Sequence, residues 1–147
     1  MSAAAGRTAA AAPGRSGLPI LNGWYAVAVS EALAPGTLER LHYFGRELVA
    51  FRTEGGEAAV LDAYCPHLGA HLGHGGRVEG EWLRCPFHGW AFDVQGACAE
   101  IPYAKRIPPN ARAGRYPTVE RNGFVFAWWD PSGRAPWYEI PEIAEAT

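Results

Sequence analysis

The chain has 147 residues, of which 48% are hydrophobic and 19% are charged, and its formal net charge at pH 7 is −2. This length and composition predict one globular domain with a sizeable core, and the charge argues against a nucleic-acid or anionic-membrane partner. The three Cys do not suggest a disulfide framework and fit a reducing compartment, so we expect a cytoplasmic location. The 18 Gly and 12 Pro, with many aromatic residues, favour a β-rich domain with many turns.

The first segment, residues 1–17, is rich in Ala, Gly and Ser and has no acidic residue. It contains no apolar run long enough for a secretory signal or a membrane span. We therefore expect a disordered N-terminal tail, with a transit peptide as the alternative.

Residues 18–64 follow the pattern of a meander of short strands. Apolar or alternating runs at 24–29, 38–44, 47–52 and 58–63 are separated by Gly- or Pro-containing turns. Helical periodicity is weak throughout this part of the chain.

Residues 62–93 contain two short loops that each hold one Cys and one His. Cys65 and His67 form a C-x-H pattern, and Cys85 and His88 form a C-x-x-H pattern after a gap of seventeen residues. Two thiolates and two imidazoles are the ligand set of a Rieske-type [2Fe–2S] cluster, in which two His replace two Cys on one iron. We therefore predict one such cluster, with these four residues as its ligands.

The residues around the ligands suit tight loops. A Pro follows each ligand Cys and restricts the backbone there. Gly69, Gly73 and Gly89 allow the chain to turn back towards the ligands. Residues 77–84 then have the pattern of a hairpin that connects the two loops.

Two other chemistries remain open. Tetrahedral zinc also takes two Cys and two His, although zinc sites usually pair like ligands, whereas each loop here is mixed. A Cys-nucleophile enzyme is the other alternative, because His88 lies three residues after Cys85, but no third member of a triad is evident nearby.

The remaining residues predict further strands. Runs at 90–93 and 98–101 flank a turn, and 102–114 is a Pro-rich basic loop. Residues 116–120 and 124–129 are expected to pair across Asn122-Gly123, a strong hairpin signal. Residues 131–147 read as a linker or C-terminal tail, so the predicted domain spans 18–130.

Several residues near the loops have both a functional and a structural interpretation. His71 and His74 could relay protons or make ordinary polar contacts. Trp90 could shield the cluster or simply pack beside it, and Cys98 is expected to be a small buried core residue. The basic loop could dock an acidic reductase or be an ordinary solvated loop; its charged residues are Lys105, Arg106 and Arg112.

These motifs together resemble the Rieske domain of ring-hydroxylating oxygenase large subunits. Within that group they are most similar to the branch of 3-ketosteroid 9α-hydroxylase oxygenases and cholesterol 7-desaturases. The likeness is carried by GWYAVA (23–28), DAYCPHLGAHLGHGGRVEG (62–80), CPFHGWAFD (85–93) and EIPYAKRIPP (100–109).

The resemblance implies an all-β Rieske fold of antiparallel sheets with a two-loop cluster-binding subdomain. It also implies single-electron transfer from a reductase or ferredoxin to a non-heme iron oxygenase centre. Family oxygenases carry a catalytic iron held by two His and a carboxylate, but no His follows His88 here. Three hypotheses are therefore kept: an electron-transfer domain, an N-terminal fragment of a steroid, sterol or aromatic-ring oxygenase, and a non-redox zinc-binding module. The sequence does not decide whether the chain itself is an enzyme.

Overall fold

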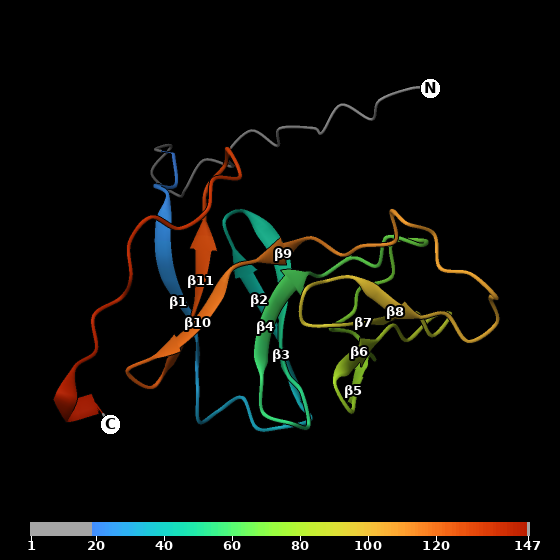
Figure 1. The fold of residues 1–147 in the computed structure, drawn as a ribbon, viewed down its shortest axis with the longest axis horizontal. Coiled ribbons are helices and arrows are strands. Elements are labelled where there is room, and N and C mark those ends of the chain that lie inside the picture. Colours follow the sequence, from blue (N-terminus) through green and yellow to red (C-terminus); the bar gives the residue numbers. More distant parts are fainter. Residues whose placement is uncertain (1–18, 147) are drawn as a thin grey trace.

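A computed structural model describes residues 19–146 as three antiparallel β-sheets with one short 3-10 helix, η1 (Ala144–Ala146). Figure 1 shows the three sheets arranged along the long axis of the molecule. The predicted all-β class is confirmed. No helix within residues 19–146 is long and apolar enough to cross a membrane. The expected tail at 1–17 lies outside the described residues.

The strands divide among the sheets as follows. The first sheet has the order β1 (Gly23–Val29), β11 (Phe124–Trp129), β10 (Thr118–Arg121). The second has the order β2 (Leu38–Tyr43), β3 (Arg46–Arg52), β4 (Ala58–Asp62), β9 (Arg115–Tyr116). The third has the order β5 (Arg77–Glu79), β6 (Trp82–Arg84), β7 (Ala91–Phe92), β8 (Cys98–Glu100).

The strand predicted over 116–120 is two strands in the structure. β9 ends at Tyr116 and pairs with β4, whereas β10 begins at Thr118 and pairs with β11. Pro117 lies between them, and because it has no N–H it cannot continue a ladder. The chain therefore changes sheets at this residue. The hairpin expected across Asn122 and Gly123 is present, with φ of 54° and 80° at its two turn residues.

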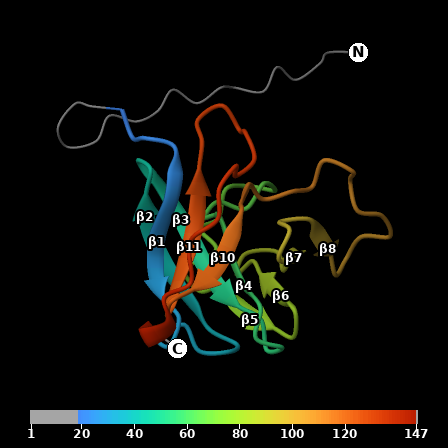
Figure 2. The same cartoon turned by 60° about the vertical axis from the view of Figure 1, so that its left-hand side comes forward.

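The second sheet lies between two hydrophobic cores. Alternate residues of β3 point to opposite faces, so Leu48 and Ala50 enter the core shared with the first sheet, and Val49 and Phe51 enter the core beneath the loops. Figure 2 shows the first sheet layered over β2 and β3. Burial on both faces explains why β3 is a continuous apolar run rather than an alternating one.

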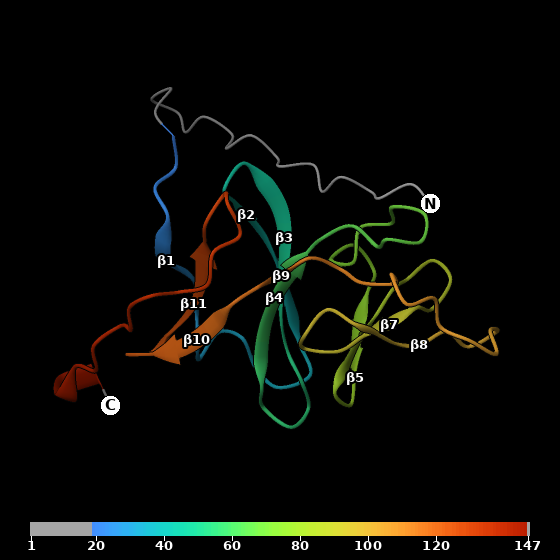
Figure 3. The same cartoon turned by 45° about the horizontal axis from the view of Figure 1, so that its top comes forward.

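The third sheet lies at the opposite end of the molecule from the C-terminus (Figure 3). Its apolar residues Leu83 and Phe92 are fully buried and share a core with Phe51 and Leu61 of the second sheet. This shared core supports the two Cys- and His-containing loops.

Residues 131–146 lie against the first sheet. The Trp24 Nε1–H group donates to the Tyr138 carbonyl oxygen at 2.9 Å, and the Trp128 Nε1–H group donates to the Arg134 carbonyl oxygen at 2.9 Å. The Trp137 ring packs edge-on against Trp128 with centroids 4.8 Å apart. The segment thus contacts β1 and β11, and the domain boundary at residue 130 stays a prediction.

Arg52 connects the first and second sheets. Its guanidinium pairs with Glu120 of β10 at 2.5 and 2.8 Å and donates to the carbonyl oxygens of Leu33, Gly56 and Ser30. The residue is only 8% exposed. Its removal would leave several buried acceptors without a donor.

We expect Arg52→Met to lower the free energy of unfolding by about 2–3 kcal/mol, because it removes a buried guanidinium and leaves the buried Leu33 carbonyl oxygen without its donor, whereas the Glu120 carboxylate, with 35% side-chain exposure, stays hydrated. Arg77→Met is the matched control, since Arg77 pairs with Glu79 but its side chain is 62% exposed. That control should cost about 1 kcal/mol or less. Urea unfolding checks both, and equal losses in the two variants would contradict this role for Arg52.

The same pair predicts a dependence of stability on pH. The hydrogen bond from Arg52 lowers the pKa of Glu120 below its ordinary value of 4.5. Because the pKa is lower in the folded state, the stabilisation is present above pH 4.5 and is lost as the pH falls through the folded-state pKa. Glu120→Gln should cost about 1 kcal/mol at neutral pH, and the difference from the unsubstituted chain should shrink in acid. Urea unfolding over a pH series measures this, and a difference independent of pH would refute it.

Candidate metal centre

The two loops close through equivalent backbone hydrogen bonds. In the first loop, residues 63–76, the Cys65 N–H donates to the Ala70 carbonyl oxygen at 2.8 Å. In the second loop, residues 85–90, the Cys85 N–H donates to the Trp90 carbonyl oxygen at 2.8 Å. Each bond spans five residues from the Cys, so the two loops are turns of the same form.

A Gly four residues after each Cys permits this turn. Gly69 and Gly89 have φ of 79° and 76°, in the left-handed region that side chains with a Cβ rarely adopt. Gly73, which the sequence analysis gave the same role, has no positive φ. A Cβ there would lie 2.5 Å from the Arg40 Cγ atom and meet only side-chain atoms, which can move, so the packing favours Gly without requiring it.

The turns bring the four predicted ligands together in space. The His67 and His88 rings are edge-on, with centroids 4.9 Å apart. Cys65 and Cys85 are each 3% exposed and belong to the same core. Burial raises the pKa of the Cys65 thiol to about 11, and the nearby Cys85 sulfur adds to this rise. A cation binding at Cys65 would therefore have to replace a tightly held proton.

The donor set fits an iron–sulfur cluster. Buried polar groups normally have hydrogen-bond partners, yet the buried Nδ1 atom of His88 has none among the described residues. All three Cys are free thiols. An imidazole nitrogen without a partner beside two buried thiols is what ligands without their metal would show.

Zinc and a Rieske cluster differ in the number of protein donors that each metal ion needs. Within residues 19–146, no group of three or more His, Cys, Asp or Glu side chains is placed to hold a single metal ion. Tetrahedral zinc needs three or four protein donors around one point, whereas a Rieske cluster needs only two for each iron.

His71 and His74 make structural contacts with the second sheet. The His71 Nε2 atom lies 3.6 Å from the Glu47 Oε2 atom, and its Nδ1 atom accepts from the Gly73 N–H at 3.0 Å. The Arg40 Nη1 atom lies 2.9 Å from the His74 Nδ1 atom. Within the described part of the chain, the His71 Nε2 atom is itself buried without a hydrogen-bond partner, as are His88 Nδ1 and Trp129 Nε1, so its contact with Glu47 is an ion-pair distance only.

The other residues singled out from the sequence lie around the loops. Cys98 is buried in the same core as Cys65 and Cys85, and burial raises its thiol pKa. Lys105 and Arg106 are exposed on the basic loop. On the same loop, Arg112 donates to the Gln95 carbonyl oxygen at 3.0 Å.

Sequence reasoning missed Arg84, the residue immediately before Cys85. Its Nη1–H group donates to the Gly89 carbonyl oxygen at 2.7 Å, and it forms ion pairs with Glu79 and Glu100. Arg84 therefore anchors the second loop to the third sheet. The sequence feature that could have indicated this role is an Arg that directly follows two apolar residues in a short strand.

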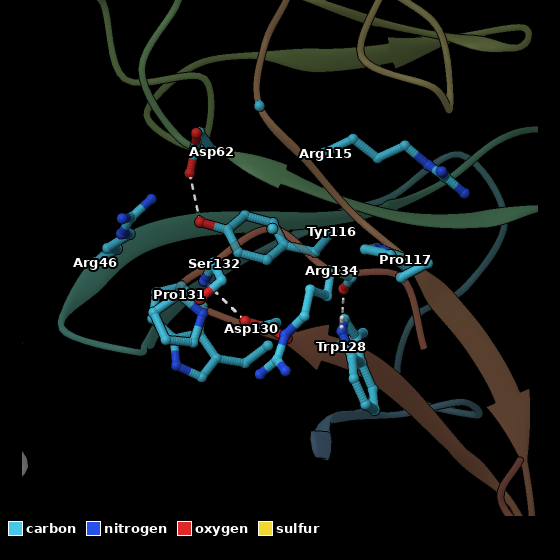
Figure 4. A pocket seen from close by; sticks show the side chains of 14 residues that line it. Arg46, Asp62, Arg115, Tyr116, Pro117, Trp128, Asp130, Pro131, Ser132 and Arg134 are labelled. Atoms are coloured by element: carbon cyan, nitrogen blue, oxygen red, sulfur yellow. Dashed lines mark hydrogen bonds and ion pairs between the residues drawn. The ribbon is translucent and has the colours of Figure 1, made fainter. Parts of the chain in front are cut away.

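A cavity of about 660 Å³ lies between β9, the end of β11 and residues 130–135. Figure 4 shows the Tyr116 hydroxyl directed at Asp62, to which it donates at 2.7 Å. The lining includes three Arg but no Cys or His. This cavity is therefore separate from the four predicted ligands.

Comparison with known proteins identifies a family for most of the chain. A model of the Rieske [2Fe-2S] domain family matches residues 23–117. Cholesterol 7-desaturase nvd of Xenopus laevis is 45% identical over 127 residues, which cover 86% of this chain and 28% of that protein. The oxygenase component of 3-ketosteroid-9-alpha-monooxygenase of Rhodococcus rhodochrous is 41% identical over 138 residues, 92% of this chain and 34% of that protein.

The fold is shared with solved oxygenase structures. Dicamba monooxygenase bound to dicamba has a TM-score of 0.71 and 30% identity, covering 85% of this chain and 37% of that one. The chain spans about a quarter to a third of the length of the curated relatives that it matches.

The packing at Gly76 gives a test of how rigid the first loop is. A Cβ at Gly76 would lie 1.9 Å from the Leu72 carbonyl oxygen, whereas a Cβ at Gly73 would meet the flexible Arg40 side chain. We expect Gly76→Ala to lower the free energy of unfolding by about 3 kcal/mol and Gly73→Ala by about 1 kcal/mol or less. Urea unfolding measures the pair, and a larger loss in Gly73→Ala would show that the backbone at Gly76 can yield.

Proposed function

Because this chain belongs to the Rieske [2Fe-2S] domain family, whose domain binds one [2Fe-2S] cluster, we propose that it passes single electrons from a reductase or ferredoxin to a non-heme iron oxygenase centre. The observation that carries this proposal is the meeting of two equivalent loops, each with one Cys and one His, at one end of the fold. No other cluster of thiols and imidazoles occurs among residues 19–146.

We propose that Cys65 and Cys85 hold one iron and that His67 and His88 hold the other. When bound, the cluster supplies a one-electron couple whose potential lies above that of an all-Cys cluster, roughly −150 to +300 mV. The chain's own part is to hold these donors in fixed positions and to keep water from the sulfur side. The 3% exposure of both Cys supports that role.

The exposed side chains beside the predicted ligands support electron exchange at this face. Leu68 and Phe87 follow His67 and precede His88, and they are 66% and 62% exposed. Apolar residues at such exposure suit transient contact with a partner protein. Lys105 and Arg106 on the basic loop would favour a donor with acidic residues on its surface.

The oxygenase centre in this proposal lies on a domain or subunit outside these 147 residues. The relatives include a sterol desaturase and a 3-ketosteroid monooxygenase component, so sterols and 3-ketosteroids are the first substrates to test with that partner. We also propose a cytoplasmic location, because three free Cys suit a reducing compartment.

The ligand assignment predicts which variants lose the cluster. We expect His67→Ala and Cys85→Ala each to lose nearly all bound iron and sulfide, because each removes one of four protein bonds to the cluster. Cys98→Ala is the matched control, since Cys98 is buried in the same core but is not a predicted ligand. Iron and acid-labile sulfide content, visible absorbance and the electron paramagnetic resonance (EPR) spectrum of the reduced protein measure the result.

The same measurements test the function. The unsubstituted chain should hold two irons and two sulfides and should take up one electron in a potentiometric titration. Colourless protein with bound zinc would overturn the electron-transfer proposal and support the zinc-binding module. Full cluster content in His67→Ala or Cys85→Ala would reject that residue as a ligand.

A further inference from the structure

Trp90 connects the two loops. Its carbonyl oxygen accepts from the Cys85 N–H at 2.8 Å, which closes the second loop. Its side chain reaches the first loop, where the indole stacks on the His67 imidazole with centroids 4.5 Å apart and planes 11° apart. A single residue thus closes one loop through its backbone and covers a predicted ligand of the other through its side chain.

Among the described residues, the indole has one hydrogen-bond partner, Tyr103, which is 63% exposed. The indole Nε1–H group donates to the Tyr103 hydroxyl oxygen at 2.7 Å. Tyr103 lies in a turn closed by the Ala104 N–H donating to the Ile101 carbonyl oxygen at 3.0 Å. This turn also lies close to the second loop, since a Cβ at Gly89 would be 3.3 Å from the Pro102 Cγ atom. Trp90 is 9% exposed, so the stack is mostly shielded from solvent.

The two predicted His ligands therefore have different surroundings. Ala70 occupies the position in the first loop that Trp90 occupies in the second, as the equivalent hydrogen bonds show. A methyl group cannot stack on an imidazole, and His88 instead contacts Phe87, whose ring is tilted by 51° and is 62% exposed. His67 is the imidazole held by a buried aromatic ring.

We propose that Trp90, held by Tyr103, is a positioning residue for His67: it fixes the plane of the imidazole and keeps water from one of its faces. The inference rests on the proposed function, because His67 matters only as a ligand. Adding an electron makes the site more negative, and water would stabilise that charge more than an indole does. The stack should therefore hold the potential below the value that a hydrated site would have.

The test uses the cluster-loaded chain and three variants. Trp90→Leu removes the stack, Trp90→Phe keeps an aromatic face without the N–H group, and Tyr103→Phe removes only the hydroxyl acceptor. Pulsed EPR of protein with ¹⁵N-labelled His measures the nitrogen hyperfine couplings of the reduced cluster, and a potentiometric titration measures the midpoint potential. Phe87→Leu is the control, because Phe87 contacts the other imidazole.

We expect Trp90→Leu to shift one of the two His couplings and to raise the potential, and Trp90→Phe to restore most of both values. Tyr103→Phe should change the same coupling and the midpoint potential in the same direction as Trp90→Leu, but by less. Phe87→Leu should leave unchanged the coupling that Trp90→Leu shifts. A role in packing alone would reduce the amount of loaded protein without altering the couplings of what remains.

Unchanged couplings and potential in loaded Trp90→Leu would overturn the proposal. If that variant loses its iron, Tyr103→Phe decides, and couplings and a potential equal to those of the unsubstituted chain in Tyr103→Phe would also overturn it. Failure of the unsubstituted chain to load any [2Fe–2S] cluster is a separate result, which would remove the proposed function and this inference with it.

Discussion

The structure depends on holding four donor atoms from two separate loops close together without a covalent link between the loops. The thiolate forms that a metal would bind are disfavoured by burial, which raises the pKa of the Cys65 thiol to about 11. The four side chains lie on two short loops, in each of which the Cys N–H donates to the carbonyl oxygen of the fifth residue after it. Family membership and donor chemistry agree on one [2Fe–2S] cluster as the cofactor.

The second sheet makes this arrangement stable. Its strands β3 and β4 are buried on both faces, so the sheet joins the core of the first sheet to the core beneath the loops. Arg52 adds a polar connection between the first two sheets, and Arg84 adds one between the third sheet and the second loop. Both loops are thus supported by packed sheets. Such packing suits donor atoms that have to keep fixed positions.

The two loops have similar backbone turns, but their predicted His ligands differ in position and in surroundings. The backbone turns match, but His67 is two residues after its Cys and His88 is three residues after its own. His67 lies under the Trp90 indole, whereas His88 lies beside the exposed Phe87 ring. One face of His67 is therefore covered by a buried indole, whereas the aromatic ring that contacts His88 is exposed.

The amino-acid sequence by itself determined the strand-rich class, the two loops that each hold one Cys and one His, and the hairpin at Asn122, because alternation, turn residues and Cys/His spacing are local properties of the chain. Gly69 and Gly89 were identifiable for the same reason. Only the tertiary structure decided which sheets the strands join at Pro117, that Arg84 holds the second loop, and that residues 131–146 pack on β1 and β11. The stack of Trp90 on His67 joins residues 23 positions apart, and no local pattern specifies which aromatic ring covers which imidazole. Such contacts follow from how the sheets pack, and that packing is settled by all of the buried residues together.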